Sequence, residues 1–417
     1  MNNSQKRVVI TGLGAITPIG NNIKEFWKGL LNKENGANKI TQFDASGHKT
    51  KFACEVKNFD PDSFIPRKEC RRLDRFTQLG IVAAMEAIEN SEILSSSVPT
   101  EDISVIWGAG IGGSKTFQDA VLANAERMNS PRFSPFLIAQ FIINIVAGHI
   151  SMKYGFRGPN FATVSACASS AHAIMAAASL IQSGQAPAAV VGGSEACINE
   201  TIIGGFNASQ ALSTRNDDPY TASRPFDVGR DGFVMGEGAS AIVIEEYESA
   251  LKRGANIYCE LKAYGASNDA YHITQPHPEG LGVSLAIKRA LSLARINPED
   301  IQLINAHATS TPTGDTAELK ALQKIFGENI GNASIHCPKS SIGHMLGAAG
   351  STEAVATILS VQNDIVPPTL NTANPESPIL DESKLPSQSP LKKTISNAIS
   401  NGFGFGGHNA VLLFGKL

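Results

Sequence analysis

The chain has 417 residues, a length that allows two or three domains. Apolar residues make up 42% of it and charged residues 18%, which supports a large buried core and excludes a disordered protein. Lys and Arg number 35 against 38 Asp and Glu, so the net charge of −3 gives no general affinity for nucleic acid. We therefore expect a soluble globular protein, and an enzyme rather than a structural chain.

Short β-branched runs alternate with longer segments whose apolar residues recur at helical spacing. This alternation is typical of an α/β fold in which helices pack on sheets. The predicted strands are Arg7–Thr11, Ile103–Trp107, Ala188–Gly192, Ala239–Glu245, Ile257–Tyr264, Ile301–Ala306, Lys393–Ser396 and Ala410–Phe414. The predicted helices are Phe76–Asn90, Cys167–Ser183, Leu281–Ala294, Thr316–Phe326 and Ser351–Gln362.

A strand, a turn and a helix of small residues occur twice, first around Ser165–Ala168 and again over Ser334–Leu359. This similarity hints at two related halves that join near Arg253–Ala255. The segment Tyr220–Gly238 is a loop rich in Gly, Asp and Arg, and it is too long and too specific for a passive linker.

Nothing in the chain predicts export or insertion into a membrane. Residues 1–6 are polar and lead directly into the first strand, so we expect no signal peptide. The most apolar window, Leu137–Gly148, is too short to cross a bilayer and predicts a buried or interface helix. The cysteines form neither a C-x-x-C pair nor a zinc-like spacing, so we expect free thiols, no metal site and a cytoplasmic location. They are Cys54, Cys70, Cys167, Cys197, Cys259 and Cys337.

The segment Gly108–Gly113 matches the G-x-G-x-x-G pattern of dinucleotide sites. Such a site also needs an acidic residue at the end of the next strand, about 20 residues on. Here that stretch, Phe117–Asn129, has the pattern of a helix and a loop. We therefore interpret the glycines as positions where backbone segments approach closely.

Cys167 lies where a strand ends and an Ala-rich helix begins. Free backbone N–H groups at a helix start stabilise a thiolate, so we expect a lowered thiol pKa there. The same groups can donate to an oxyanion. A lone cysteine is more often a small core residue, but small residues on both sides leave room for a substrate.

Two histidine motifs give the cysteine a context. Asn305–Pro312 places His307 at a strand end beside hydroxyl groups, and Pro338–Gly350 places His344 in a Gly-rich turn that enters a helix. Each histidine alone would more often be structural, and neither has the spacing of a zinc ligand. Two neutral imidazoles near a cysteine suit acyl-thioester chemistry, because they can donate to a developing enolate oxygen.

A fourth motif, Asn401–Asn409, sets two Phe residues among glycines, as in a flexible loop or a tight turn. With these four motifs in order, the chain resembles the β-ketoacyl-acyl carrier protein synthases of the elongating Cys-His-His type. The resemblance runs from Arg7 to Phe414 and is strongest to the synthase I and II group of fatty acid synthesis.

The resemblance implies the thiolase fold, in which duplicated α/β halves form a five-layered αβαβα core. Residues 1–254 would form the N-terminal half, with the nucleophile and the dimer or cap insertions. Residues 255–417 would form the C-terminal half, with both catalytic histidines and the Gly-Phe gating loop.

The resemblance also implies the roles of matching residues. Cys167 matches the nucleophile that takes the acyl chain from the carrier's phosphopantetheine. His307 and His344 match the pair that promotes malonyl decarboxylation and steadies the enolate. Lys339 matches the lysine that organises the second histidine, and Glu353 matches the acid that pairs with this lysine.

The remaining implied roles concern the substrate. Thr309 and Thr311 match residues that bind the pantetheine arm. The N–H groups of Cys167 and Phe405 match the oxyanion hole, and the Phe405 ring matches the gate. Further substrate-binding positions, among them the lining of the acyl pocket, are Ile111, Phe206 and Phe403. Two departures from the family pattern are Pro338, before the lysine, and Gln210, where some relatives have a basic residue at the carrier interface.

The implied activity is the decarboxylative Claisen condensation of an acyl-enzyme thioester with malonyl-acyl carrier protein, in fatty acid chain elongation. No cofactor is implied, since the phosphopantetheine arrives on the carrier. The implied partners are acyl carrier protein and a second copy of the chain, and no nucleic acid or membrane is expected. Phe133–Val146 is more apolar than one helix face requires, which agrees with a homodimer.

Other functions remain to be weighed. A polyketide or polyene ketosynthase would use the same chemistry, and the motifs do not distinguish it. A non-catalytic partner resembling a chain-length factor usually lacks the nucleophile, so Cys167 argues against it. A degradative thiolase would have a second cysteine in Asn401–Asn409, and an initiating synthase would have Asn in place of His344. A Cys–His hydrolase is disfavoured because condensation requires water to be excluded.

A basic stretch is the expected docking surface for the acidic carrier protein, with a solvated helix face as the alternative. Arg75 belongs to the same stretch, and Glu69 or Asp74 could pair with some of its members. The residues assigned to docking are Arg67, Lys68, Arg71, Arg72 and Arg132.

Overall fold

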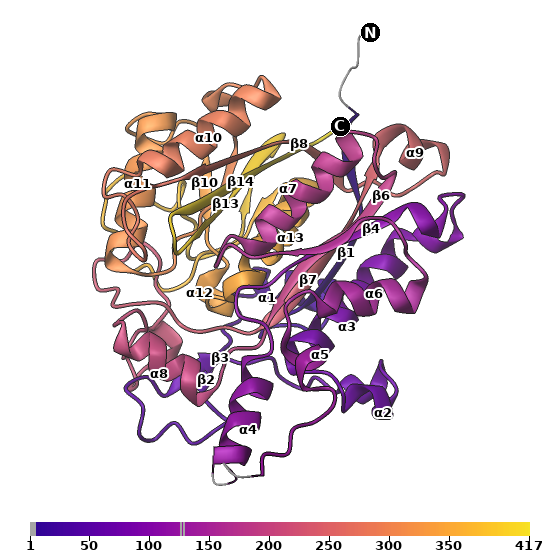
Figure 1. Cartoon of the computed structure of the whole chain (residues 1–417). Coiled ribbons are helices and arrows are strands. Elements are labelled where there is room, and N and C mark those ends of the chain that lie inside the picture. The colour runs from indigo at the N-terminus through magenta and orange to yellow at the C-terminus, as the bar shows by residue number, and fades with distance from the viewer. Residues whose placement is uncertain (1–5, 126, 128–129) are drawn as a thin grey trace.

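The computed structural model describes residues 6–125, 127 and 130–417 (Figure 1). Its main sheet has the strand order β10-β9-β13-β14-β8-β1-β7-β6-β4-β5. These strands are β1 Val8–Ile16, β4 Ile103–Gly108, β5 Asn160–Thr163, β6 Ala188–Glu195, β7 Gly238–Glu246, β8 Cys259–Asn268, β9 Leu303–Asn305, β10 Ser334–His336, β13 Asn397–Gly404 and β14 His408–Gly415. Two small sheets pair β2 Ala37–Lys39 with β3 Phe52–Cys54, and β11 Ile365–Val366 with β12 Leu391–Lys392.

The strand order of one half of the main sheet repeats in the other. From edge to centre, β5-β4-β6-β7-β1 corresponds to β10-β9-β13-β14-β8. In both halves the outer three strands are parallel, and the next two pair antiparallel. The halves meet where β1 pairs with β8. This repeat is the duplication that the resemblance implied. The division into domains at residue 254 stays a prediction, because both halves share one sheet.

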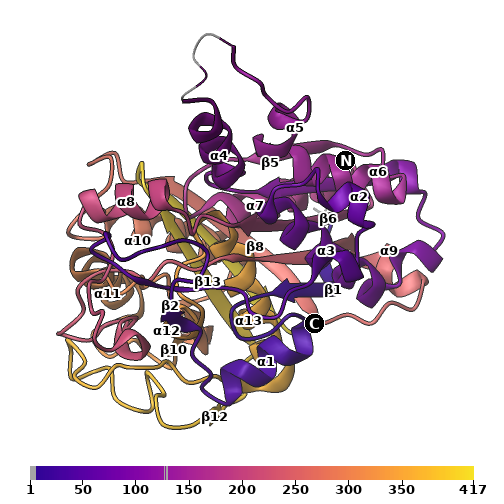
Figure 2. The same cartoon turned by 90° about the horizontal axis from the view of Figure 1, so that it is seen from below.

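Helices form the remaining layers. α7 (Ser169–Gln182) and α13 (Ala349–Asn363) pack against each other and against strands of both halves, so they form the central layer. α3 (Arg75–Ser91) and α6 (Ile145–Tyr154) cover the N-terminal half, whereas α10 (Leu281–Ala294) covers the C-terminal half and packs on α11 (Pro312–Phe326). Figures 1 and 2 show these outer helices on opposite sides of the molecule.

The central helices consist mainly of small residues because they lie between two sheet halves. Almost every residue of α13 is buried. At the crossing with α7, a Cβ atom added to Gly350 would lie 2.8 Å from the Cβ of Ala171. A larger residue there would push the helices apart, so the composition of these segments sets the thickness of the central layer.

Several predicted boundaries are corrected by the structure. Lys393–Ser396 is not a strand; the strand is β13, which starts at Asn397. The window Leu137–Gly148 is not one helix: it contains α5 (Leu137–Phe141) and the start of α6, because the backbone at Ile142 is extended. The helix predicted from Thr316 begins at Pro312, since proline fits the first turn of a helix.

The other helices are α1 Ile23–Leu31, α2 Arg67–Cys70, α4 Ser114–Ala125, α8 Glu200–Ala208, α9 Tyr247–Lys252 and α12 Lys339–Ile342. Short 3-10 turns lie at Pro61–Ser63, Ile93–Ser95, Thr100–Asp102, Pro219–Thr221, Pro298–Asp300 and Leu346–Ala348, the last of which is η6.

In the described ranges, no helix combines the length and the apolar character needed to cross a bilayer. Residues 1–5, on which the expectation of no signal peptide mainly rests, lie outside these ranges. All six cysteines lie within them, and each is a free thiol.

Candidate active site

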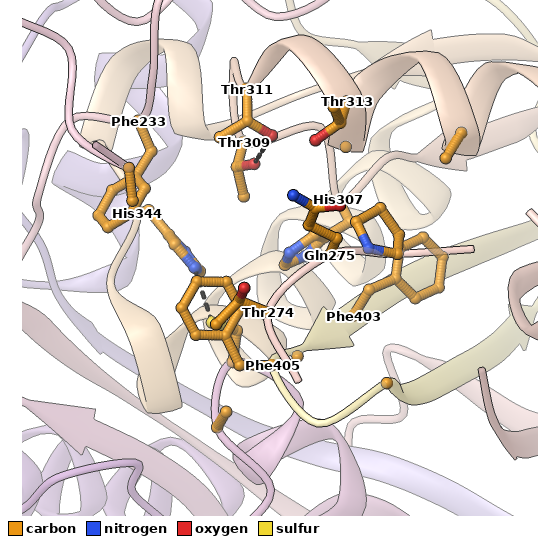
Figure 3. A pocket seen from close by; sticks show the side chains of 18 of the residues that line it. Phe233, Thr274, Gln275, His307, Thr309, Thr311, Thr313, His344, Phe403 and Phe405 are labelled. Carbon is orange, nitrogen blue, oxygen red and sulfur yellow. Dashed lines mark hydrogen bonds between the residues drawn. The ribbon is translucent and has the colours of Figure 1, made fainter. Parts of the chain in front are cut away.

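A cavity of about 520 Å³ lies between the ends of strands from both halves of the sheet (Figure 3). It is lined by nine residues that the sequence assigned to catalysis or substrate binding. They are Ile111, Cys167, Phe206, His307, Thr309, Thr311, His344, Phe403 and Phe405.

Cys167 occupies a tight turn between β5 and α7. Ala166 has a φ of 50°, a left-handed conformation that is unusual for a residue with a side chain. The N–H of Ala168 donates to the carbonyl of Ser165 at 3.1 Å, which closes the turn. Helix α7 begins at Ser169, two residues after the cysteine and not at it. The strained turn therefore presents the thiol to the cavity at the start of the helix.

The thiol of Cys167 does not have the lowered pKa that its position predicts. Burial raises the pKa of Cys167 to about 12, and the carboxylate of Glu195 contributes in the same direction. The Lys339 ammonium and the N–H of Phe405 oppose this rise. The cost of desolvating a thiolate outweighs these stabilising groups, so the resting site holds a neutral thiol.

His344 lies directly beside Cys167. Its Nε2 is 2.9 Å from Sγ of Cys167. Its backbone is held on both sides, because the N–H of His344 donates to Val234 and its carbonyl accepts from Gly236. The pKa of His344 lies well below its usual value because of burial and, second, the Lys339 charge. The imidazole is therefore neutral.

His307 follows β9, and its ring stands nearly perpendicular to that of His344, with 5.4 Å between the centroids. The N–H groups of His307 and Ala308 donate to the two oxygens of Glu318, at 2.9 and 2.7 Å. Burial, then the charge of Lys339, lowers the pKa of His307 well below its usual value. Both imidazoles are thus neutral hydrogen-bonding groups that face one cavity.

Lys339 is buried behind the histidines and corrects one expectation. The sequence assigned it to the second histidine, but its Nζ lies 3.4 Å from Nδ1 of His307, the first one. Its expected partner Glu353 is confirmed as the carboxylate that pairs with Nζ. An ammonium that donates to Nδ1 leaves the proton of His307 on Nε2. Lys339 therefore orients His307 directly and affects His344 only through its charge.

The Gly-Phe loop between β13 and β14 closes one side of the cavity. A Cβ atom on Gly404, the last residue of β13, would lie 3.0 Å from the nitrogen of Cys167, so the chain enters this loop directly over the turn that holds Cys167. Phe405, the next residue, is 38% exposed, and its ring is 6.4 Å from that of Phe206. Phe403 lies 5.4 Å from His307, measured between ring centroids. The end of β13 and the turn after it thus place one aromatic ring beside His307 and another beside Phe206.

The two threonines lie on another wall of the cavity (Figure 3). Their hydroxyl oxygens are 3.1 Å apart. Both precede α11, and Thr311 is its N-cap residue. Arg230 holds the start of this helix by donating to the carbonyls of Thr311 and Pro312 at 3.0 and 2.8 Å. Arg230 belongs to the loop Tyr220–Gly238, which confirms that this loop is more than a linker.

The Gly-rich segment Gly108–Gly113 forms close backbone contacts, as expected. A Cβ atom on Gly108 would lie 2.4 Å from the nitrogen of Ser170, and one on Gly113 would lie 2.5 Å from the Cα of Phe141. The segment surrounds the buried carboxylate of Glu195, which was not predicted from the sequence. Only the position of Glu195 at the end of a Gly-containing strand could have indicated it.

The basic residues assigned to docking are all exposed, and none of them lines the cavity. Four of them lie on α2 or directly after it, and Arg132 lies on the segment between α4 and α5. Arg67 lies 3.5 Å from Asp62, and the Arg72 guanidinium lies 4.4 Å above the Phe136 ring. Arg75 pairs with the buried Glu237 at 2.7 Å and is unavailable for docking. Asp74 caps α3 and accepts from Thr116, so it does not neutralise the stretch.

Comparison with known proteins places this site in a family. Residues 5–250 match the family described as beta-ketoacyl synthase, N-terminal domain, and residues 258–373 match beta-ketoacyl synthase, C-terminal domain. The chain belongs to the beta-ketoacyl synthase family. The expected family and its thiolase-like α/β fold are therefore confirmed.

Three similar proteins illustrate the match. The chain is 46% identical over 415 residues to 3-oxoacyl-(acyl-carrier-protein) synthase 2 of Synechocystis sp., covering 100% of this chain and 99% of the relative. The structure of a beta-ketoacyl synthase from Burkholderia phymatum has a TM-score of 0.90 and a sequence identity of 32%, and the match covers 99% of this chain and 100% of that chain. A third match is the structure of a type II polyketide synthase acyl-carrier protein in complex with its ketosynthase, bound to the hexaketide. It has a TM-score of 0.88 and a sequence identity of 29%, and the match covers 99% of this chain and 100% of that chain.

Proposed function

We propose that this beta-ketoacyl synthase condenses an acyl group held on Cys167 with malonyl-acyl carrier protein, in fatty acid chain elongation. The observation that carries the proposal is the cluster of one thiol and two neutral imidazoles in a single cavity. The higher identity to a synthase 2, 46% against 29% for the polyketide ketosynthase, favours elongation of fatty acids over polyketide assembly.

In the first step, Cys167 attacks the thioester carbonyl of an acyl carrier. The acyl group moves to Sγ, and the pantetheine sulfur leaves with the thiol proton. The N–H groups of Cys167 and Phe405 would stabilise the oxyanion, since the gating loop crosses directly over the nucleophile turn. The acyl chain would then extend along the wall formed by Ile111 and Phe206.

In the second step, malonyl carrier enters and its carboxylate leaves as CO₂, which converts the thioester into an enolate. His307 donates through Nε2, because Lys339 faces its Nδ1. His344, at 2.9 Å from Sγ, lies beside the carbon that the enolate must reach. The enolate carbon attacks the acyl-cysteine, and collapse of the adduct breaks the bond between the carbonyl carbon and Sγ. This step releases the β-keto product and the Cys167 thiolate, which takes up one proton from the solvent to restore the thiol.

We assign the carrier to the basic surface around α2 and Arg132, with its pantetheine arm passing Thr309 and Thr311. Positive charge there would attract an acidic partner, and the hydroxyls of the two threonines face the cavity that the arm must enter. The phosphopantetheine remains part of the substrate, so no resident cofactor is assigned. The six free thiols agree with a cytoplasmic location.

We further assign a homodimer. Strand β5 lies at the edge of the sheet, and its Phe161 is exposed, as is Val164 just beyond it. An unpaired edge strand beside an apolar surface favours association with a second copy. Helix α6 packs on β5, α5 packs on α6, and α4 packs on α5. These helices and the segment before α5 carry further exposed apolar residues, which are Phe117, Val121, Leu122, Phe133, Phe136, Ile138 and Met152.

The activity is tested by incubating the protein with an acyl carrier and malonyl carrier and weighing the products by mass spectrometry. We expect a β-keto product that is longer by two carbons, and none from Cys167→Ala. Cys259→Ala, which removes a buried thiol in β8, serves as the matched control and should remain active. Elongation by Cys167→Ala would refute the proposal.

A further inference from the structure

The carboxylate of Glu195 is buried at the end of β6 without any exposed surface. Its Oε1 accepts the N–H groups of Ile111 at 3.1 Å and Gly112 at 2.9 Å. Its Oε2 accepts those of Gly110 at 2.7 Å and Gly347 at 3.0 Å. Each oxygen thus has two donors, and four backbone dipoles stabilise the charge.

The four donors belong to two segments that are distant in sequence. One is the loop after β4, and the other is η6, which follows His344. The two segments touch, since a Cβ atom on Gly347 would lie 2.1 Å from the nitrogen of Gly110 and 2.6 Å from Oε2 of Glu195. The carboxylate of Glu195 therefore links the two segments through hydrogen bonds to the backbone of each.

Each segment also supplies a side chain to the wall of the cavity. Ile111 and Leu346 both line it and pack in one apolar cluster with Cys167. Leu346 has a φ of 45°, a strained conformation for a branched residue, and its neighbour Gly347 donates to Glu195. The contact with the carboxylate holds this strained residue in place.

From these contacts we propose that Glu195 is a positioning residue for selection of the acyl chain. It acts through Ile111 and Leu346, whose places in the cavity wall it fixes, and never touches the substrate. The inference rests on the proposed condensing function. It also explains the glycine pattern: the segment wraps around a carboxylate of its own chain, where a nucleotide site would hold a phosphate.

Glu195→Gln tests the role, because its amide nitrogen would face two N–H donors in place of an acceptor. A long acyl chain touches the walls along its length, whereas a short one ends near the cysteine. We therefore expect kcat/KM for a long acyl carrier to fall about tenfold more than for a short one. Glu195→Asp, which withdraws the carboxylate by one methylene, should shift the same ratio in the same direction.

Glu86→Gln is the matched control. Glu86 accepts the N–H groups of Ala15 and Ile23 and does not line the cavity. This variant should keep the ratio of long to short substrates at the wild-type value. The proposal would be overturned if the ratio of long to short substrates stayed within about twofold of wild type in both Glu195 variants, or if this ratio rose. Failure of both variants to fold would also overturn it. Absence of elongation by the wild-type protein would instead refute the proposed function.

Discussion

At the scale of single residues, the two histidines differ in what holds them. Nδ1 of His307 faces the buried ion pair of Lys339 and Glu353, whereas His344 is held through its backbone and touches the thiol. Both rings are neutral because burial and the same ammonium disfavour a second charge. One lysine therefore keeps two donors available for a developing negative charge.

We expect His307→Ala and His344→Ala to slow malonyl decarboxylation far more than acylation of Cys167. Loss of one donor to a developing oxyanion costs about 100-fold to 1000-fold in rate. Release of CO₂ from malonyl carrier measures the first reaction, and mass spectrometry of the intact protein measures the second. Loss of acylation with unchanged decarboxylation would show that the roles are assigned incorrectly.

The lowered pKa values of both histidines predict how the rate depends on pH. A group whose pKa is lowered stays neutral at a lower pH than an ordinary imidazole, which is half protonated near pH 6.5. In Cys167→Gln, whose amide mimics an acylated cysteine, decarboxylation should therefore be constant between about pH 8 and pH 6. A fall with a midpoint near pH 6.5 would mean that the rings titrate normally.

At the scale of elements, the crossing of α7 and α13 depends on Gly350. An added Cβ atom would meet Ala171 at 2.8 Å, so Gly350→Ala should lower the free energy of unfolding by about 1–3 kcal/mol. Gly205→Ala is the control, because nothing lies within 4 Å of that position in α8 and alanine favours a helix. Chemical denaturation of both variants measures the difference. Equal stabilities would indicate that the central layer adjusts freely.

Elements with a clear periodic pattern could be predicted from the sequence, and others could not. Leu281–Ala294 was predicted to the residue, because its apolar spacing is regular and Gly280 precedes it. β13 was missed, because its Asn, Gly and Ser residues have little preference for strands. It forms through pairing with β9 and β14, which is a tertiary effect.

In the site, too, some residues could be predicted from the sequence and others could not. Cys167 and both histidines lie at the ends of recognisable elements, so their motifs could be assigned to one site, and all three line the same cavity. Glu195 could not be found in this way, because its donors lie 83 to 152 residues away along the chain. The pKa of Cys167 was predicted in the wrong direction, since a helix start is visible in the sequence and the extent of burial is not.

At the scale of the whole molecule, the sheet edge at β5 predicts a dimer. Light scattering at micromolar concentration should give twice the mass of the chain. Ile138→Asp, which places a charge on the exposed apolar surface, should shift the protein toward monomer. Leu293→Asp, which alters an exposed apolar position on α10, is the control and should remain dimeric. A monomeric wild-type protein would contradict the assignment.

The basic surface around α2 predicts how the carrier is received. Lys68 and Arg71 are exposed and do not line the cavity, so they can affect encounter with an acidic partner and not the chemistry. We expect Lys68→Glu or Arg71→Glu to raise the apparent KM for acyl carrier by about tenfold, and added salt to have the same effect on the wild type. Turnover of a small acyl-pantetheine mimic should not change.

Lys288→Glu, which alters an exposed position on α10 on the opposite side of the molecule, is the matched control (Figures 1 and 2). Equal losses on carrier and mimic would show that the basic stretch supports the fold and does not receive the carrier.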